Sequence, residues 1–208
     1  MLLDPFYLIV DNSQAITKLV PLGVKLVQLR IKNKTEYEIK QQIIEASEIC
    51  KTYNCQLIIN DYWELAYELG CDFVHLGQED LAAVNIKSLA KTNMKIGIST
   101  HTHDELNTAL STINKGVNLA YIALGPIYET RLKKMSFAPQ GLDRIAEWKK
   151  LIVPIPLVAI GGLSIERAKL CLQKGADSTA VVTDISLNEN PVQRTLEWIN
   201  EISTRKTI

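Results

Sequence analysis

The sequence lacks an excess of charge of either sign. Lysine and arginine together number 23, as do aspartate and glutamate, so the formal net charge over 208 residues is zero. Proteins that bind nucleic acid or anionic membranes usually carry a basic excess. The balance therefore argues against nucleic acid and membrane as partners. A composition that is 47% hydrophobic and 22% charged also excludes disorder, collagen and coiled coil.

Cysteines are few, and long apolar runs are missing. The four cysteines form no CxxC pair and no metal-binding spacing, which is typical of reduced thiols in a cytosolic protein. The longest apolar run, Leu151 to Leu163, contains two prolines and a glycine pair. It is too short for a bilayer, which takes about 20 apolar residues. The first residues lack the basic start and apolar core of a signal peptide. We therefore expect a soluble, cytoplasmic protein.

What the sequence does contain is a regular alternation of apolar runs and amphipathic stretches. Eight short, β-branched runs read as strands buried on both faces: Phe6–Val10, Val24–Arg30, Gln56–Asn60, Phe73–Leu76, Lys95–Ser99, Leu119–Leu124, Pro156–Ile160 and Ser178–Val182. Five stretches between or after them read as helices: Glu36–Tyr53, Asp104–Ile113, Leu142–Lys150, Ile165–Lys174 and Pro191–Ile202.

This alternation predicts an α/β fold, a single (β/α)₈ TIM barrel in which residues 1–208 form one domain. The alternative is a doubly wound open sheet. It is disfavoured because Val10-Asp11-Asn12-Ser13, after the first strand, contains no glycine and so no dinucleotide fingerprint. One long stretch without periodicity, Gly125 to Gly141, is expected to be a functional loop.

Active sites of such barrels lie at the carboxyl ends of the strands, and most of the predicted strand ends are polar. Cationic side chains suited to phosphate oxygens are Arg30, Lys32 and Lys133. Asp61 and Asp80 follow adjacent strands and are hard oxygen ligands suited to Mg²⁺. Taken alone, Asp61 could instead cap the helix that follows it. His75, in an apolar strand end, favours a hydrogen-bonded structural role over catalysis.

A phosphate site is also indicated near the seventh strand. Gly161-Gly162 precedes Ser164, a natural helix N-cap, so backbone N–H groups there can face a phosphate. Phosphate binding in this part of a TIM barrel is common. No Ser/His/Asp or Cys/His arrangement suggests a covalent nucleophile.

Several of these motifs together resemble the thiamine-phosphate synthase family, in register from about Phe6 to the last helix. They include Gln28-Leu29-Arg30-Ile31-Lys32, Asn60-Asp61, the hexapeptide from His75 to Asp80, and Gly97-Ile98-Ser99-Thr100-His101. The resemblance implies a transferase of thiamine biosynthesis. It would join the small molecules hydroxymethylpyrimidine pyrophosphate and hydroxyethylthiazole phosphate, giving thiamine phosphate and pyrophosphate with Mg²⁺ as cofactor.

The resemblance also implies roles for individual residues. Arg30, Lys32 and Lys133 would be catalytic through the leaving pyrophosphate, and Asp61 and Asp80 would bind the metal. Substrate-binding residues would be Gln28, Leu29, Arg30, Ile31, Lys32, Asn60, Ser99, Thr130, Arg131, Leu132, Lys133, Gly162, Val182 and Thr183. The family mechanism is dissociative, through a pyrimidine methylene cation captured by the thiazole nitrogen.

Two departures from the family pattern bear on the thiazole phosphate. Leu132 stands where the family usually has a second threonine, whereas Thr183 keeps the hydroxyl that the family usually supplies from serine. We hypothesise that Arg131 replaces the missing hydroxyl contact, because a guanidinium suits phosphate oxygens.

Two other functions remain as alternatives. A thiazole tautomerase of the same fold would not need two metal carboxylates, and a non-catalytic thiazole-phosphate binding protein is suggested by Leu132. Closure of the Gly125–Gly141 loop as a lid is a further hypothesis. The sequence leaves the oligomeric state open, a homo-oligomer included.

Overall fold

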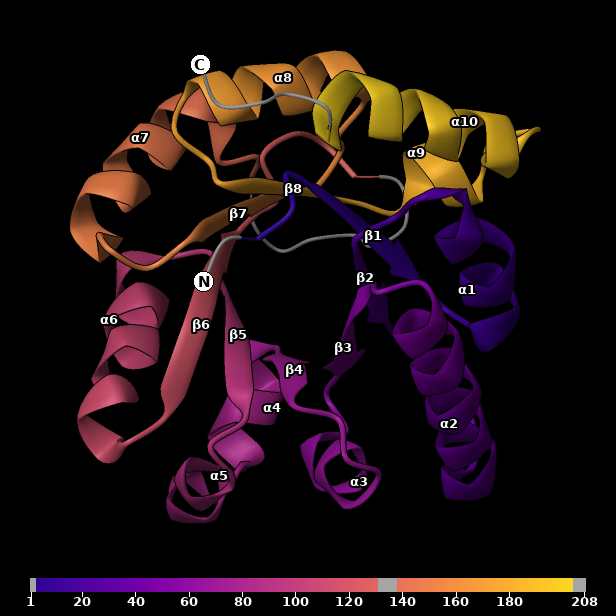
Figure 1. Ribbon diagram of the computed structural model, residues 1–208. Helices are drawn as coiled ribbons and strands as arrows, with labels where there is room; N and C mark the ends of the chain where they lie inside the picture. The colour runs from indigo at the N-terminus through magenta and orange to yellow at the C-terminus, as the bar shows by residue number, and fades with distance from the viewer. Residues whose placement is uncertain (1–2, 131–137, 204–208) are drawn as a thin grey trace.

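A computed structural model describes residues 3–130 and 138–203 of the chain. Eight parallel strands form a closed barrel in chain order, with β1 and β8 paired to complete the circle, and helices surround it (Figure 1). The predicted TIM barrel is confirmed. The strands are β1 (Phe6–Val10), β2 (Leu26–Leu29), β3 (Gln56–Asn60), β4 (Phe73–Leu76), β5 (Lys95–Thr100), β6 (Asn118–Leu124), β7 (Leu157–Ile160) and β8 (Ser178–Val181).

The described helices follow the strands. They are α1 (Ser13–Leu19), α2 (Glu36–Thr52), α3 (Trp63–Glu68), α4 (Gln78–Ala83), α5 (Ile86–Thr92), α6 (His103–Ser111), α7 (Gly141–Ile152), α8 (Ile165–Gln173), α9 (Thr183–Ser186) and α10 (Pro191–Trp198). Short 3-10 turns occupy Val20–Leu22 and Ile113–Lys115, and a π turn over Ile199–Ser203 follows α10.

Local sequence explains where the helices begin. The longest helix, α2, starts at a capping box, in which Thr35 accepts from the backbone of Glu38 and the Glu38 carboxylate accepts from the backbone of Thr35. Asn12, Asn85 and Thr102 each cap the helix that follows through a side-chain oxygen. Such caps satisfy the first backbone N–H groups and fix the residue at which each helix begins.

The core has two layers, as expected for strands buried on both faces. The larger layer lies between barrel and helices and includes Trp148 and Trp198, both fully buried. The smaller layer fills the barrel itself and includes Tyr7, Phe73 and Tyr121. The barrel is therefore a packed core, and its polar ends are the place for a site.

The predicted elements differ from the structure at their boundaries and in the short helices. The predicted strand over Val24–Arg30 begins only at Leu26 and ends at Leu29, and the predicted helix over Pro191–Ile202 leaves α-helical geometry after Trp198. For five helices the sequence analysis gives no range: α1, α3, α4, α5 and α9. Each has seven residues or fewer, which gives the apolar stripe too few turns to be recognised.

Hydrogen bonds hold the first residues of the Gly125–Gly141 stretch against the barrel and its last residues against the first ones. The Ile127 N–H donates to the Ile160 carbonyl at the end of β7, and the Gly141 N–H donates to the Ile127 carbonyl. The middle of the stretch, 131–137, lies outside the described residues, as does the lid hypothesis that concerns it.

Two other expectations are addressed by the described residues. None of the helices within 3–130 and 138–203 combines the length and apolar character needed to cross a bilayer. All four cysteines are free thiols; Cys50, Cys55 and Cys171 are buried, and Cys71 is partly exposed.

Candidate active site

The ends of β3 and β4 bring two carboxyl groups together. Asp61 follows β3, and Asp80 lies in the first turn of α4, which follows β4. Burial raises the pKa of Asp80, and the negative charge of Asp61 and the hydrogen bond between the two carboxyl groups raise it further. Two carboxylates in contact repel each other unless a cation neutralises them. This corner of the barrel rim is therefore suited to a cation.

Lys32, beyond the end of β2, supplies one cationic group at the same corner. Its Nζ lies 2.5 Å from Oδ2 of Asp61, and the Asp61 side chain is only 12% exposed. The backbone of Asp61 is left-handed, with φ of 69°, and its N–H donates to the His75 carbonyl on β4. Aspartate tolerates this conformation better than most residues. It does not cap α3, because the N-cap of that helix is Tyr62 and no side chain caps it.

The side chains of the five residues from Gln28 to Lys32 point alternately to the two sides of the chain. Gln28 is buried inside the barrel, while Leu29 and Ile31 are buried in the layer between barrel and helices. Arg30 and Lys32 are exposed at the rim. Side-chain contact with a substrate is therefore open to Gln28, Arg30 and Lys32, and Leu29 and Ile31 can offer only their backbone.

Polar side chains from β3, β4 and β5 adjoin one another just inside the rim. Asn60, which is 5% exposed, is paired with His75 in the register of β3 and β4. His75 contacts Ser99 through Nε2 and Tyr121 through Nδ1, each at 2.8 Å. Burial lowers the pKa of His75 to about 4, although the negative charge of Asp61 opposes this shift. His75 is thus a neutral, hydrogen-bonded histidine.

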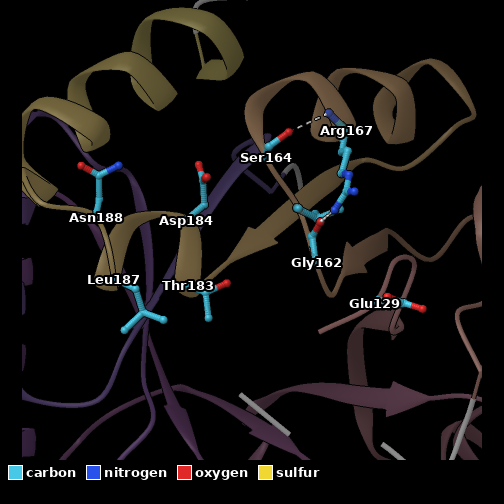
Figure 2. Close-up of a pocket in the computed structure, with 9 residues that line it drawn as sticks. Glu129, Gly162, Ser164, Arg167, Thr183, Asp184, Leu187 and Asn188 are labelled. Carbon is cyan, nitrogen blue, oxygen red and sulfur yellow. Dashed lines mark hydrogen bonds between the residues drawn. The ribbon is translucent and has the colours of Figure 1, made fainter. Parts of the chain in front are cut away.

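The other side of the rim, at the ends of β6, β7 and β8, holds a cavity of about 310 Å³ (Figure 2). Its lining combines backbone, hydroxyl and charged groups from the segments that follow β6, β7 and β8: Glu129, Gly162, Leu163, Ser164, Arg167, Thr183, Asp184, Leu187 and Asn188. Ser164 caps α8 by accepting from the N–H of Arg167, as predicted. The start of α8 therefore faces the cavity with its positive end.

The backbone conformation at this cavity requires a glycine at position 162. Its φ is 65°, and a Cβ placed on it would lie 2.3 Å from the carbonyl oxygen of Glu129. The guanidinium of Arg167 donates to the Gly162 carbonyl at 2.6 Å and lies over the ring of Tyr128, 4.5 Å from its centroid. The segments after β6 and β7 can therefore approach each other this closely only because Gly162 has no side chain.

Val182 and Thr183 lie where β8 passes into α9. Thr183 lines the cavity, and the next residue, Asp184, is anchored to α10. Oδ2 of Asp184 accepts from Trp198 Nε1 at 2.7 Å and from Arg194 Nε at 2.8 Å. These bonds fix the position of the short helix that carries Thr183.

The remaining predicted residues can be placed only in part. Thr130 is the last described residue before the gap, next to Glu129 in the cavity lining. Arg131, Leu132 and Lys133 lie outside the described residues. The hypothesis that Arg131 takes over a phosphate contact therefore stays a prediction.

Comparison with known proteins adds to this geometry. The family model described as "Thiamine monophosphate synthase" matches residues 6–185. A thiamine-phosphate synthase from Rhizobium etli is 53% identical over 199 residues, covering 96% of this chain and 95% of the relative. The chain belongs to the thiamine-phosphate synthase family. Its activity is that of a thiamine-phosphate synthase, a transferase of thiamine biosynthesis.

More distant members of the family agree. The thiamine-phosphate synthase from Salmonella typhimurium is 41% identical over 180 residues, covering 86% of this chain and 83% of the relative. A solved structure, "Thiamine phosphate pyrophosphorylase from Pyrococcus furiosus", is 24% identical and has a TM-score of 0.81, covering 96% of this chain and 95% of that one. At this identity the solved structure supports the fold alone.

Sequence reasoning about this synthase missed several residues of the site. Arg167 was overlooked because it follows the glycine pair by five positions and reads as an ordinary helical cation. Tyr7 and Tyr121 were absorbed into apolar runs, although both hydroxyl groups lie inside the barrel. The sequence does contain a signal for their orientation. Each tyrosine alternates along its strand with residues that face the helices, so its side chain must point into the barrel.

Proposed function

We propose that the two sides of the rim hold the two substrates of the synthase reaction. The β2–β5 side would bind hydroxymethylpyrimidine pyrophosphate with Mg²⁺, and the β6–β8 side would bind hydroxyethylthiazole phosphate. The observation that carries this proposal is the ion pair of Lys32 with Asp61 next to the Asp80 carboxyl group, whose pKa is raised by burial and by the charge of Asp61. Residues 1–208 are proposed to act as one domain in the cytoplasm, where free thiols are expected.

The residues at this corner fit Mg²⁺. Mg²⁺ in proteins is usually held by one or two carboxylates, with the remaining positions taken by water and substrate phosphates. Asp61 and Asp80 provide such a pair. Burial raises the pKa of Asp80 first and the negative charge of Asp61 raises it further, and a divalent cation would relieve this second effect. Within 3–130 and 138–203, no group of three or more His, Cys, Asp or Glu forms a closed protein cage. The pair therefore fits an ion whose coordination substrate completes.

The pyrophosphate of the pyrimidine substrate would lie against Arg30, Lys32 and Lys133. Lys32 already contacts Asp61, so its ammonium is positioned beside the carboxylate pair before substrate arrives. Gln28, Asn60 and Ser99 face the barrel interior just below and would orient the pyrimidine ring. The backbone of Leu29 and Ile31 would complete this subsite.

The thiazole phosphate would occupy the cavity between β6 and β8. Backbone N–H groups at Gly162 and at Val182-Thr183 are its proposed partners, aided by the Thr183 hydroxyl. Thr130, Arg131 and Leu132 are proposed to close the subsite from the adjoining loop. The positive end of α8 favours an anion in this place.

The reaction then needs one bond to break and one to form. The methylene carbon–oxygen bond of the pyrimidine substrate breaks, and its electron pair leaves with the pyrophosphate. The thiazole nitrogen donates its lone pair to the methylene cation and forms the carbon–nitrogen bond. When bound, Mg²⁺ supplies positive charge that stabilises the leaving pyrophosphate. Arg30, Lys32 and Lys133 add fixed positive charge, and no side-chain nucleophile takes part.

A product assay tests this proposal. Purified protein is incubated with both substrates and Mg²⁺, and thiamine phosphate and pyrophosphate are measured together. We expect the two products in equal amounts, and neither when one substrate is omitted. Binding of the thiazole phosphate without product would support the non-catalytic alternative, and isomerisation of a thiazole substrate without pyrophosphate release would support the tautomerase.

A further inference from the structure

A chain of hydrogen bonds crosses the inside of the barrel just below the pyrimidine subsite. It joins five side chains from five strands: Gln28, Tyr7, Tyr121, His75 and Ser99. Neighbouring members are 2.7–2.9 Å apart. All but Ser99 are at least 92% buried, since His75, the most exposed of them, is 8% exposed. The two ends, Gln28 and Ser99, are residues that we propose to contact the pyrimidine substrate.

The direction of this chain follows from its first member. Gln28 Nε2 can only donate, so the Tyr7 hydroxyl accepts from it at 2.7 Å. The hydrogen of Tyr7 then has the Tyr121 oxygen as its acceptor, and the hydrogen of Tyr121 has Nδ1 of His75. In the opposite direction, the buried Tyr7 hydrogen would have no acceptor among the members of the chain. Only the first direction uses every hydrogen.

We propose that His75 is a positioning residue with its proton on Nε2, which donates to Ser99 and leaves the Ser99 hydroxyl to donate to the pyrimidine substrate. This inference rests on the proposed function of Ser99 as a substrate contact. Because Nε2–H occupies one lone pair of the Ser99 oxygen, the serine hydrogen turns away from the histidine. A hydroxyl fixed in this way stabilises an acceptor atom without reorganising during the reaction.

The packing around His75 holds it in this orientation. Its ring stacks on that of Tyr121 at 10° between the planes and 5.6 Å between centroids. Tyr121 in turn lies across Gly97, where a Cβ would fall 2.1 Å from the ring. The carbonyl of Ser99 accepts from Gln78 Nε2, which ties β5 to α4.

The first experiment compares two substitutions of His75. Glutamine carries an N–H as many bonds from the backbone as Nε2, so His75→Gln can still donate to Ser99. The amide of His75→Asn ends at the level of Nδ1, which faces Tyr121, and cannot reach Ser99. We expect kcat/KM for the pyrimidine substrate to fall about ten- to a hundredfold in His75→Asn and several times less in His75→Gln. The KM for the thiazole phosphate should change little in either variant.

The second experiment measures the tautomer directly and needs no substrate. Nitrogen-15 NMR of histidine-labelled protein distinguishes protonated from unprotonated ring nitrogens, and His75→Gln identifies the signals of His75. We expect an unprotonated Nδ1 and a protonated Nε2 in the wild type. Tyr121→Phe removes the donor to Nδ1, so a mixture of both tautomers is expected there. His103→Gln, at the first residue of α6, where the exposed ring contacts Glu147, is the control and should leave kinetics unchanged.

Three results would overturn the inference. The first is an Nδ1–H tautomer or a charged ring in the wild type. The second is an equal loss of kcat/KM in His75→Asn and His75→Gln. The third is a rise in KM for both substrates alike, which would indicate general structural damage. A wild type that forms no thiamine phosphate would instead refute the proposed function, while the NMR result would still decide the direction of the chain.

Discussion

The two sides of the barrel rim are built by different means. On the β2–β5 side, charged side chains contact one another directly, as Lys32 and Asp61 do at 2.5 Å and Asp61 does with Asp80. On the β6–β8 side, the cavity is shaped by backbone, above all by Gly162 with its left-handed φ of 65°. The β2–β5 side, the charged side, holds charged side chains in fixed positions. The β6–β8 side, the backbone side, holds backbone N–H groups and the start of α8 in fixed positions.

This difference indicates which changes should harm each side. The charged side should be sensitive to loss of charge or of the metal, because carboxylates in contact depend on a cation. The backbone side should be sensitive to added bulk and comparatively tolerant of single side-chain losses. A change that harms one side should therefore leave the other side intact.

Removal of the metal should abolish the function of the charged side. With a chelator present, we expect thiamine phosphate formation to fall at least about a hundredfold, because metal stabilisation of the leaving group contributes several kcal/mol. Added Mg²⁺ should restore the rate. Unfolding by urea should hardly change, because the fold does not depend on the ion. A full rate in excess chelator would mean that the charged side works without metal.

Gly162→Ala should impair binding at the backbone side. The new Cβ would lie 2.3 Å from the Glu129 carbonyl oxygen at a left-handed position, so the strand ends must shift. We expect KM for the thiazole phosphate to rise about tenfold or more, while KM for the pyrimidine substrate changes little. Steady-state kinetics with each substrate varied separately measures both.

Gly70→Ala is the matched control for that substitution. Gly70 also has a left-handed φ, 75°, but no atom lies within 4 Å of the point that a Cβ would occupy there. It should lose stability by about 1 kcal/mol in urea unfolding and keep its kinetics. Equal kinetic losses in both alanine variants would show that backbone strain, rather than crowding at the cavity, is responsible.

Arg167→Ala should have a smaller effect on the same side. Arg167 lines the cavity and stacks on Tyr128, yet it is an exposed cation whose interactions are screened by water. We expect KM for the thiazole phosphate to rise about two- to fivefold. Arg144→Ala, which removes a similar stacked guanidinium over Trp148, is the control and should leave both KM values unchanged. An unchanged KM in Arg167→Ala would remove this residue from the phosphate subsite.

Much of the fold was predictable because buried parallel strands leave a strong local signal. The bounds of β3 and β4 agree with the predicted ranges, since each is a short apolar run closed by polar residues. Helices α3 and α4 were missed because six residues hold less than two turns of periodicity. Their positions are set by tertiary packing against the barrel, which no local pattern encodes.

The site was predictable to the extent that it lies at strand ends. The contact between Asp61 and Asp80 was expected from two adjacent strands, and the cap at Ser164 from its place after the glycine pair. The hydrogen-bond chain through Tyr7 and Tyr121 was not predicted, because it depends on which side chains meet across the barrel. That information comes from the closed arrangement of β1, β4 and β6 and from the space left by Gly97.

A double-mutant cycle tests whether Asp61 and Asp80 hold one Mg²⁺ between them. The turnover of Asp61→Asn, Asp80→Asn and the double variant is measured across a Mg²⁺ titration, with Asp72→Asn, an exposed partner of Lys95, as control. We expect a strong loss in each single variant and little further loss in the double variant, because both substitutions disable one unit. Losses that multiply in the double variant, or wild-type Mg²⁺ dependence in either single one, would contradict it.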